Sequence, residues 1–283
     1  MTDWSRRLGA CYRSYGCRRS GASEGDSRKE QKKCAALLAA VLSWSLSAHA
    51  GWYVVDNYQG HIGPYAVHLS LQKRDGFGSG LNLLGSYYYD SRHAPIPLYG
   101  KRVGAILELC EVHNPSEYDK YLIQGSKHGF DTSHCPFKLI SGDRALRGTW
   151  QDGGRRYDVS MTSTASLDDT TSPGSAEGEV DIPFWGQTET HAFVGVYQGT
   201  AEGLAIRRIN VIDKKTGKVD QVVDPQLHGC QFGFFTTPIY MNLESAKSPY
   251  EVQLNCYSNG RFDVTVGYRF DKASHRYRVV GDN

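Results

Sequence analysis

The sequence predicts an all-β protein made of two antiparallel modules of the sandwich or barrel type, stapled by disulfides. After Gly51, apolar residues recur with a period of two, and short apolar runs are separated by turn sequences. No segment of the N-terminal module has a convincing 3.6-residue apolar stripe of an amphipathic helix. An even number of cysteines remains once an N-terminal leader is set aside, which is typical of a disulfide-stabilised exported protein.

Residues 1–50 have the organisation of a leader with a signal peptide. Lys32 and Lys33 precede an apolar segment at 34–47, and Ala48-His49-Ala50 matches the A-x-A cleavage pattern. A buried helix is the alternative, but the apolar run ends at small residues and a β-like segment follows at once. Residues 1–30 indicate either a start assigned too far upstream or an unusually long leader. We expect cleavage after Ala50 and a periplasmic or secreted protein.

The charge of the mature chain differs from that of the precursor. The whole chain has 32 basic and 30 acidic residues and a formal charge of +2, and the leader contains nine of the basic and four of the acidic ones. The remaining 233 residues therefore have 23 basic and 26 acidic side chains, a charge of −3. This near-neutral charge does not indicate a nucleic-acid partner. No apolar run reaches the roughly 18–20 residues of a spanning helix, so no transmembrane segment is expected in the mature chain.

Four cysteines remain in the mature chain after Cys11, Cys17 and Cys34 leave with the leader: Cys110, Cys135, Cys230 and Cys256. Four cysteines allow three pairings. We expect the local pairs Cys110–Cys135 and Cys230–Cys256, each closing a loop of about 25 residues and contributing roughly 3 kcal/mol. No C-x-x-C sequence indicates a redox motif or a zinc ribbon.

The N-terminal module, residues 51–165, is expected to be an antiparallel meander. Turn sequences such as Asp152-Gly153-Gly154 separate its apolar runs, and the stretch around Asn114-Pro115-Ser116 is interpreted as a polar loop. The expected strands are Tyr65–Leu71, Leu83–Tyr89, Ile96–Tyr99, Ile106–Val112, Phe137–Ile140, Ala145–Trp150 and Tyr157–Met161.

The C-terminal module is predicted at residues 191–283, after a linker or long loop at 166–190. Residues 167–179 are small, polar and glycine-bearing, which favours a loop. Asn259-Gly260 indicates a hairpin between the fourth and fifth strands of the module. The expected strands are Phe193–Tyr197, Leu204–Ile212, Val219–Val223, Glu251–Tyr257, Phe262–Phe270 and His275–Val280.

Sequence motifs of catalysis and metal binding are missing. The G-x-S-x-G match at 21–25 lies in the leader, and neither a phosphate-binding loop nor H-E-x-x-H occurs. Asp213 to Gly217 has a lysine where a calcium loop needs its second acid, and Asp168-Asp169 is interpreted as a solvated loop. The nine mature histidines are scattered. We expect no catalytic residue, no metal and no cofactor.

The candidate binding residues are aromatic or lie in a glycine-rich loop. In a strand, Tyr87 and Tyr89 share one face and Tyr88 lies on the other. The tyrosines suit cross-strand packing or, alternatively, a binding surface. The loop at 74–81 contains Phe77, an anchor or a hairpin tip, and Ser79. We name Phe77, Ser79, Tyr87 and Tyr89 as candidates.

Two resemblances extend over most of the mature chain. Leu84 to Tyr89, Ile96 to Gly100, Leu107 to Glu111 and Leu146 to Trp150 resemble a pattern of exported proteobacterial β-proteins, mostly without an assigned function. Gly217 to Gln221, Tyr268 to Asp271 and His275 to Tyr277 resemble periplasmic immunity proteins related to the invertebrate-type lysozyme inhibitors.

The second resemblance implies a β-sandwich that blocks a peptidoglycan hydrolase by inserting a loop into its cleft. The chain departs from that pattern in two places. Residues 240–245 keep only Asn242 and Glu244 of an acidic calcium segment, and Asn82 occupies the tyrosine position of the S-G-x-Y loop.

We therefore expect an exported, non-enzymatic binding protein of the cell envelope, whose partner is a lysozyme-like cell-wall hydrolase or another envelope protein. A charge of −3 steers cationic lysozymes only weakly. The alternatives are a structural or small-ligand-binding envelope protein that uses a barrel mouth, and a hydrolase.

Overall fold

The computed structural model describes residues 53–74, 80–168, 178–200, 203–225, 239–258 and 262–281. Within these ranges the protein consists of antiparallel strands with one α-helix and one short 3₁₀ helix. The all-β class with barrel and sandwich elements is confirmed. The predicted signal peptide, the loop with Phe77 and Ser79, and Cys230 lie outside the described residues.

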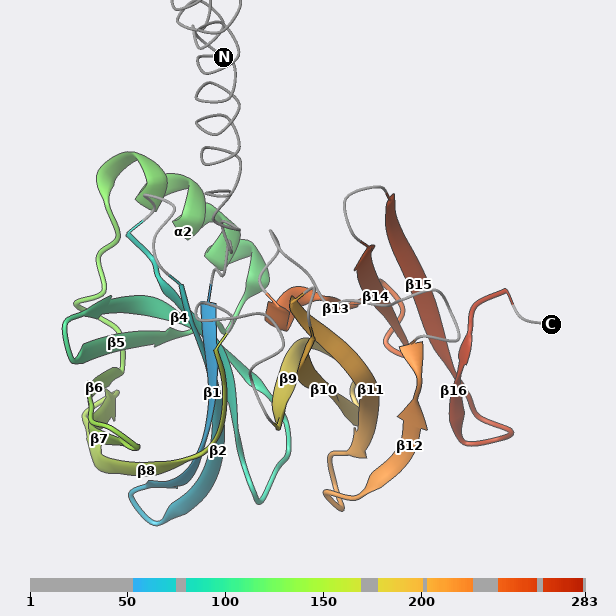
Figure 1. Cartoon of the computed structure of the whole chain (residues 1–283), viewed down its shortest axis with the longest axis horizontal. Helices are drawn as coiled ribbons and strands as arrows, with labels where there is room; N and C mark the ends of the chain where they lie inside the picture. Colours follow the sequence, from blue (N-terminus) through green and yellow to red (C-terminus); the bar gives the residue numbers. More distant parts are fainter. Residues whose placement is uncertain are drawn as a thin grey trace, which may run out of the picture. The chain divides into compact units, whose positions relative to one another are not determined.

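The N-terminal module is a closed eight-stranded barrel in which each strand pairs with the next and the last pairs with the first (Figure 1). Closure leaves no exposed sheet edge. The strands are β1 (Tyr53–Ile62), β2 (Tyr65–Arg74), β3 (Leu83–Tyr89), β4 (Ile96–Val103), β5 (Ile106–Glu111), β6 (Phe137–Ser141), β7 (Ala145–Asp152) and β8 (Arg155–Asp168).

The barrel interior is filled by side chains from alternate positions of its strands. On β2, for example, Val67, Leu69 and Leu71 are buried inside. Eight strands leave an interior just wide enough for side chains to fill. The remaining members of this core are Tyr58, Ile62, Leu83, Tyr87, Leu98, Leu107, Leu109, Phe137, Leu139, Leu146, Trp150, Val159 and Met161.

Helix α2 (Pro115–His128) corrects the prediction of a polar loop around Asn114-Pro115-Ser116. Asn114 caps the helix by accepting a hydrogen bond from the Ser116 backbone N–H at 3.0 Å, and a proline follows at the first helical position. The helix packs through Tyr118 and Tyr121, whose rings each lie 5.0 Å from that of Tyr99 on β4. Few apolar residues hold it in place, so apolar periodicity alone could not indicate it.

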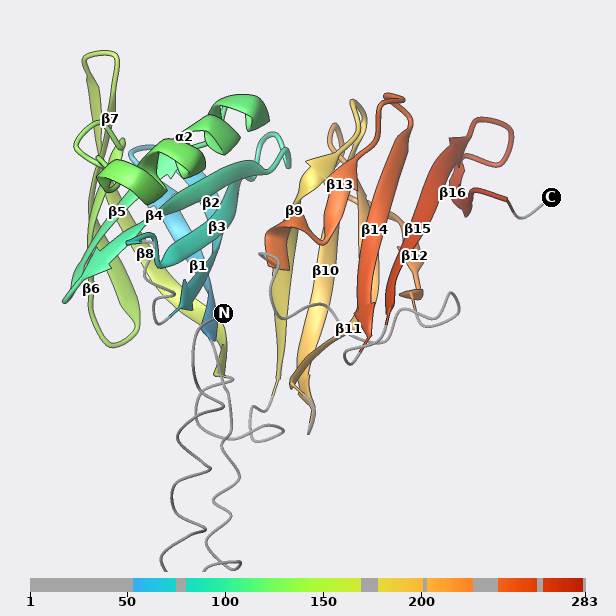
Figure 2. The same ribbon diagram turned by 90° about the horizontal axis from the view of Figure 1, so that it is seen from above.

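The C-terminal module contains two four-stranded sheets (Figure 2). The first has the order β12-β11-β10-β9, with β9 (Glu179–Gln187), β10 (His191–Thr200), β11 (Gly203–Asp213) and β12 (Val219–Val223). The second has the order β13-β14-β15-β16, with β13 (Leu243–Ser245), β14 (Glu251–Ser258), β15 (Phe262–Asp271) and β16 (Arg276–Val279). The 3₁₀ helix η3 (Ile239–Met241) precedes β13.

The two sheets are joined by hydrogen bonds at both edges. Ser245 of β13 bonds the backbone N–H and C=O of Gln187 on β9 at 3.0 and 2.8 Å. Gln221 of β12 likewise bonds the backbone C=O and N–H of Tyr277 on β16 at 2.9 and 2.7 Å. The side chains of two residues thus connect the edge strands and position the sheets.

Strand β9 lies inside the range 166–190 that the sequence predicts as a linker or long loop. Val180, Ile182 and Phe184 alternate along it and are at most 1% exposed. The loop was expected from the small, polar and glycine-bearing residues 167–179, most of which precede this strand. Among the described residues, the first strand of the second module therefore begins at Glu179 instead of after residue 190, and residues 169–177 lie outside the described residues.

An apolar core connects the outer face of the barrel with the second module. It joins barrel residues such as Val55 and Leu84 to Phe184 and Phe193. The indole N–H of Trp185 on β9 also donates to the Gly85 carbonyl of β3 at 2.8 Å. Part of the barrel exterior is therefore buried, unlike the solvated face of an isolated antiparallel sheet.

The predicted pair Cys110–Cys135 is confirmed, because the two residues, 25 apart in sequence, form a disulfide. The bridge closes the segment that contains α2 onto the end of β5. The predicted pair Cys230–Cys256 cannot be assessed from geometry, because Cys230 and the side chain of Cys256 lie outside the described part of the chain.

Candidate functional site

Tyr87 and Tyr89 both point into the barrel, with Tyr88 on the outer face, as the period of a strand predicts. Tyr87 is 1% exposed, so it packs in the core and is not available at the surface. Its hydroxyl donates to Glu111 at 2.7 Å, and the indole N–H of Trp150 donates to the same carboxylate oxygen at 2.8 Å. Burial, followed by the Glu111 charge, raises the pKa of Tyr87 far above its ordinary value.

Tyr89 lies half-buried where the barrel opens. Its ring makes edge contacts with Tyr87 at 5.5 Å and with Tyr65 at 5.8 Å, and Tyr65 also contacts Tyr157. Tyr65 is 48% exposed and forms the outer rim. Edge-to-face packing accounts for these rings without a ligand.

The groups that converge around a cavity lie elsewhere, where β1, β2, β3 and β8 of the barrel meet β9 and β11. The cavity has a volume of about 370 Å³, within the size range of small-molecule sites. We call it the junction cleft. It is lined by Asn57, Tyr58, His68, Leu69, Ser70, Tyr88, Thr164, Ala165, Glu179, Asp181, Pro183 and Arg208.

Asn57 fixes the two walls of the junction cleft against each other. Its side-chain amide donates to the Asp181 carbonyl at 2.7 Å, and its amide oxygen accepts from the Asp181 backbone N–H at 2.8 Å. The Thr164 hydroxyl donates to the Asn57 carbonyl at 3.3 Å. One barrel residue therefore sets the position of Asp181 through the backbone of β9.

His68 is oriented by a carboxylate and by an aromatic ring. Its Nδ1 lies 2.7 Å from Oδ1 of Asp90, and its ring stacks on Tyr88 at 5.2 Å with an interplanar angle of 14°. Burial raises the pKa of Tyr88 to about 12, with the charges of Asp181 and Asp90 acting in the same direction. Tyr88 is therefore a neutral hydroxyl in the cleft at physiological pH.

The cleft has an excess of negative charge. Arg208 donates two hydrogen bonds to Glu179, at 3.0 and 2.9 Å, so this pair is internally neutralised. Asp181 makes no salt bridge with a described residue. Desolvation by burial raises the pKa of Asp181; Arg208 opposes this, Glu179 adds to it, and His68 opposes it.

His68 has a carboxylate partner but no nucleophile as a hydrogen-bond partner among the described residues. No described serine, threonine or cysteine hydrogen-bonds His68, and the nearby Ser70 hydroxyl is buried and paired with Tyr240 at 2.8 Å. A nucleophile, a base and an orienting group are therefore not assembled around His68 among the described residues. The carboxylate of Asp181, which makes no salt bridge with a described residue, lines the same cleft.

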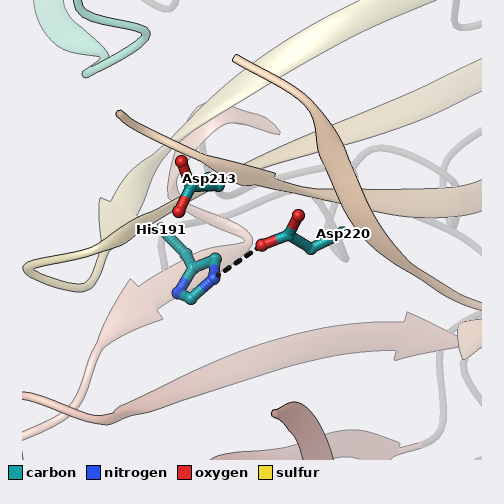
Figure 3. A group of neighbouring side chains, drawn as sticks. All are labelled: His191, Asp213 and Asp220. Carbon is teal, nitrogen blue, oxygen red and sulfur yellow. Dashed lines mark hydrogen bonds and ion pairs between the residues drawn. The ribbon is translucent and has the colours of Figure 1, made fainter. Parts of the chain in front are cut away.

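A separate group of side chains in the second module could hold a metal ion (Figure 3). Ligand atoms of His191, Asp213 and Asp220 all lie within 4.8 Å of one another, and within the described ranges they are the one such group of three. From the sequence we considered only Asp213 of these three, as part of a calcium loop. The three residues come from neighbouring strands, so no local spacing indicates them.

None of the cleft residues His68, Tyr88 and Asp181 was among the sequence-based candidates. The one available signal was the position of Tyr88 on the opposite face from Tyr87 and Tyr89. Phe77 and Ser79 lie outside the described residues, so a binding role for them stays a prediction.

Comparison of the chain with protein-family models, curated proteins and solved structures finds no match in any of the three. In the ranges that the structure describes, no helix combines the length and the apolar character needed to cross a membrane.

Proposed function

We propose that this protein is a non-enzymatic binding protein whose junction cleft takes a positively charged organic group, an amine or a guanidinium. The supporting observation is Asp181, a carboxylate that makes no salt bridge with a described residue and lines a cavity of about 370 Å³. Asp181 is exposed on β9, so a cationic ligand could reach its carboxylate and form an ion pair with it.

The neighbouring charges support a cation over an anion. Arg208 is held by both oxygens of Glu179, and these hydrogen bonds lower the pKa of Glu179 and raise that of Arg208. Arg208 is therefore engaged by Glu179 and is not free to attract an anion. A cation in the cleft would face Asp181 and the neutral hydroxyl and amide groups of Tyr88 and Asn57, which also line it.

The binding test compares arginine with citrulline, whose side chain has a similar shape but a neutral ureido group in place of the guanidinium. Isothermal titration of the protein is expected to show binding of arginine and at least tenfold weaker binding of citrulline. Asp181→Asn is expected to remove this preference. Asp143→Asn, an exposed acid in the turn between β6 and β7, is the matched control and should behave as the wild type.

Equal affinity for arginine and citrulline, or an unchanged preference in Asp181→Asn, would contradict the assignment of the cleft as a cation site. Absence of arginine binding at millimolar concentration would contradict it as well.

The more specific hypothesis, inhibition of a peptidoglycan hydrolase, comes from the sequence resemblance. A basic side chain of such an enzyme would present the same chemistry as arginine. Lysozyme and a panel of bacterial muramidases are therefore titrated with the purified protein. Full activity at micromolar excess of the protein would rule out the inhibitor hypothesis, whereas inhibition that Asp181→Asn relieves would place the enzyme on the cleft.

A further inference from the structure

We propose that His191, Asp213 and Asp220 form a Zn²⁺ site at one end of the β10–β11–β12 sheet. None of these residues lines the junction cleft, so this inference is independent of the proposed function. His191 is the first residue of β10, Asp213 is the last residue of β11, and the two are paired in register. Asp220 extends toward them from β12 (Figure 3).

The spacing of the ligand atoms is that of two ligands on one metal ion. Nε2 of His191 lies 3.3 Å from Oδ2 of Asp220. Ligand atoms at Zn²⁺ distances of 2.0–2.2 Å in a tetrahedral site are about 3.3–3.5 Å apart. All three residues offer an atom within 4.8 Å of the others, so a rotamer adjustment of the exposed Asp220 or the half-buried Asp213 suffices to complete the set.

The imidazole is oriented as a metal-binding histidine is. Its Nδ1 lies 2.9 Å from the Thr190 hydroxyl and 3.4 Å from the Tyr277 hydroxyl. Tyr277 is itself held by Thr188 at 2.8 Å. Hydroxyls that accept the Nδ1–H fix the tautomer and leave the lone pair of Nε2 for the metal, which is the role of outer partners in zinc sites.

Two carboxylates share this single imidazole, which leaves the group short of positive charge. Asp213 accepts a hydrogen bond from the Thr216 backbone N–H at 2.6 Å, which fixes one of its oxygens. The adjacent Lys214 donates to the Thr188 carbonyl at 2.5 Å instead of either carboxylate. Among the described residues, only His191 pairs with Asp220, and no salt bridge is made by Asp213.

The donor set, one nitrogen and two carboxylate oxygens, is compatible with Zn²⁺. Imidazole and carboxylate are common Zn²⁺ ligands, and three protein ligands leave a fourth position for water. Asp220 is exposed, so the open position faces solvent and the ion can exchange. The alternative is a plain ion pair between His191 and Asp220, which needs no metal.

The experiment uses the full, untagged chain after treatment with a chelator. Calorimetric titration with Zn²⁺ and a thermal scan with and without the ion are compared for the wild type, Asp220→Asn and Glu189→Gln. Glu189 is an exposed acid in the turn before His191 that is not part of the group, so its variant is the matched control. Asp220 is also exposed, so its substitution leaves the buried network around His191 intact.

We expect one Zn²⁺ per chain, a melting temperature that rises with Zn²⁺, and at least tenfold weaker binding by Asp220→Asn. Glu189→Gln should bind as the wild type does. Co²⁺ should give the visible spectrum of a four-coordinate nitrogen and oxygen site without thiolate charge-transfer bands, which excludes binding to cysteines. Unchanged affinity in Asp220→Asn, thiolate bands, or no binding at 0.1 mM would overturn the proposal and leave the ion pair.

Discussion

At the residue scale, the three consecutive tyrosines show how one strand serves two environments. Tyr87 is buried in the barrel core and bonded to Glu111, whereas Tyr88, one residue later, lines the junction cleft. The alternation was predictable from the period of a strand. Which face would border a cavity was not, because the answer depends on β9 and β11 from the second module.

Asp181 has a testable effect on stability with pH. Desolvation by burial raises the pKa of its carboxyl group above the ordinary value of 3.8, so the native state binds the proton more tightly than the unfolded state. Its contribution to the free energy of unfolding therefore falls as pH rises from about 3.8 toward the raised native pKa.

We expect Asp181→Asn to raise the melting temperature at pH 7 and to change it little at pH 3, where the wild-type carboxyl is protonated in both states. Thermal scans at the two pH values check this, with Asp143→Asn as the control. A lower melting temperature of Asp181→Asn at pH 7 would show that the charge is already stabilised in the native protein.

At the scale of elements, the disulfide and α2 form one unit. Cys110 is the second-last residue of β5, Cys135 precedes β6, and α2 lies between the two cysteines in sequence. Glu108 of β5 adds a polar link, since it accepts hydrogen bonds from Thr132 and from Lys138 at 2.9 Å. These hydrogen bonds lower the pKa of Glu108. The bridge therefore limits the freedom of the segment that contains the helix.

Replacement of both Cys110 and Cys135 by serine is expected to lower the free energy of unfolding by roughly 3 kcal/mol, because the unfolded chain regains the freedom of a loop of about 25 residues. Urea unfolding of the oxidised wild type and the double variant measures the difference. A change well below 1 kcal/mol would indicate that the packing of α2 on Tyr99 holds the segment without the bridge.

The elements also differ in how far the sequence specifies them. Strands β3 (Leu83–Tyr89) and β12 (Val219–Val223) are predicted with the bounds that the structure has. Helix α2 and strand β9 were missed. Tyrosines from α2 pack on the barrel, and proline and glycine interrupt β9, so tertiary contacts stabilise both where local pattern is weak.

At the scale of the whole molecule, the barrel and the second module share a core. Trp185 of β9 bonds Gly85 of the barrel, and Tyr240 of η3 bonds Ser70 of β2 at 2.8 Å. The apolar cluster that contains Val55 and Phe184 runs through the same junction. Separating the modules would expose this surface and leave buried polar groups without partners.

We therefore expect one cooperative thermal transition, in which the barrel and the second module unfold together. Calorimetry checks this expectation through the agreement of calorimetric and van't Hoff enthalpies.

Tyr240→Phe leaves the buried Ser70 hydroxyl without its partner and should lower the free energy of unfolding by about 1–3 kcal/mol. Hydrogen exchange should rise equally in peptides from β4 to β7 and from β14; two separate transitions, or a change confined to one module, would contradict this.

The sequence was sufficient for the β class, for most strands and their faces, and for the Cys110–Cys135 pair. These features depend on local alternation and on cysteines 25 residues apart. Closure of the barrel, the junction cleft and the His191 group depend on long-range pairing. Asn57 and Asp181, for instance, are 124 residues apart in sequence. Such contacts form because separate apolar faces are buried together, and one-dimensional periodicity shows that a face is apolar without showing which partner will cover it.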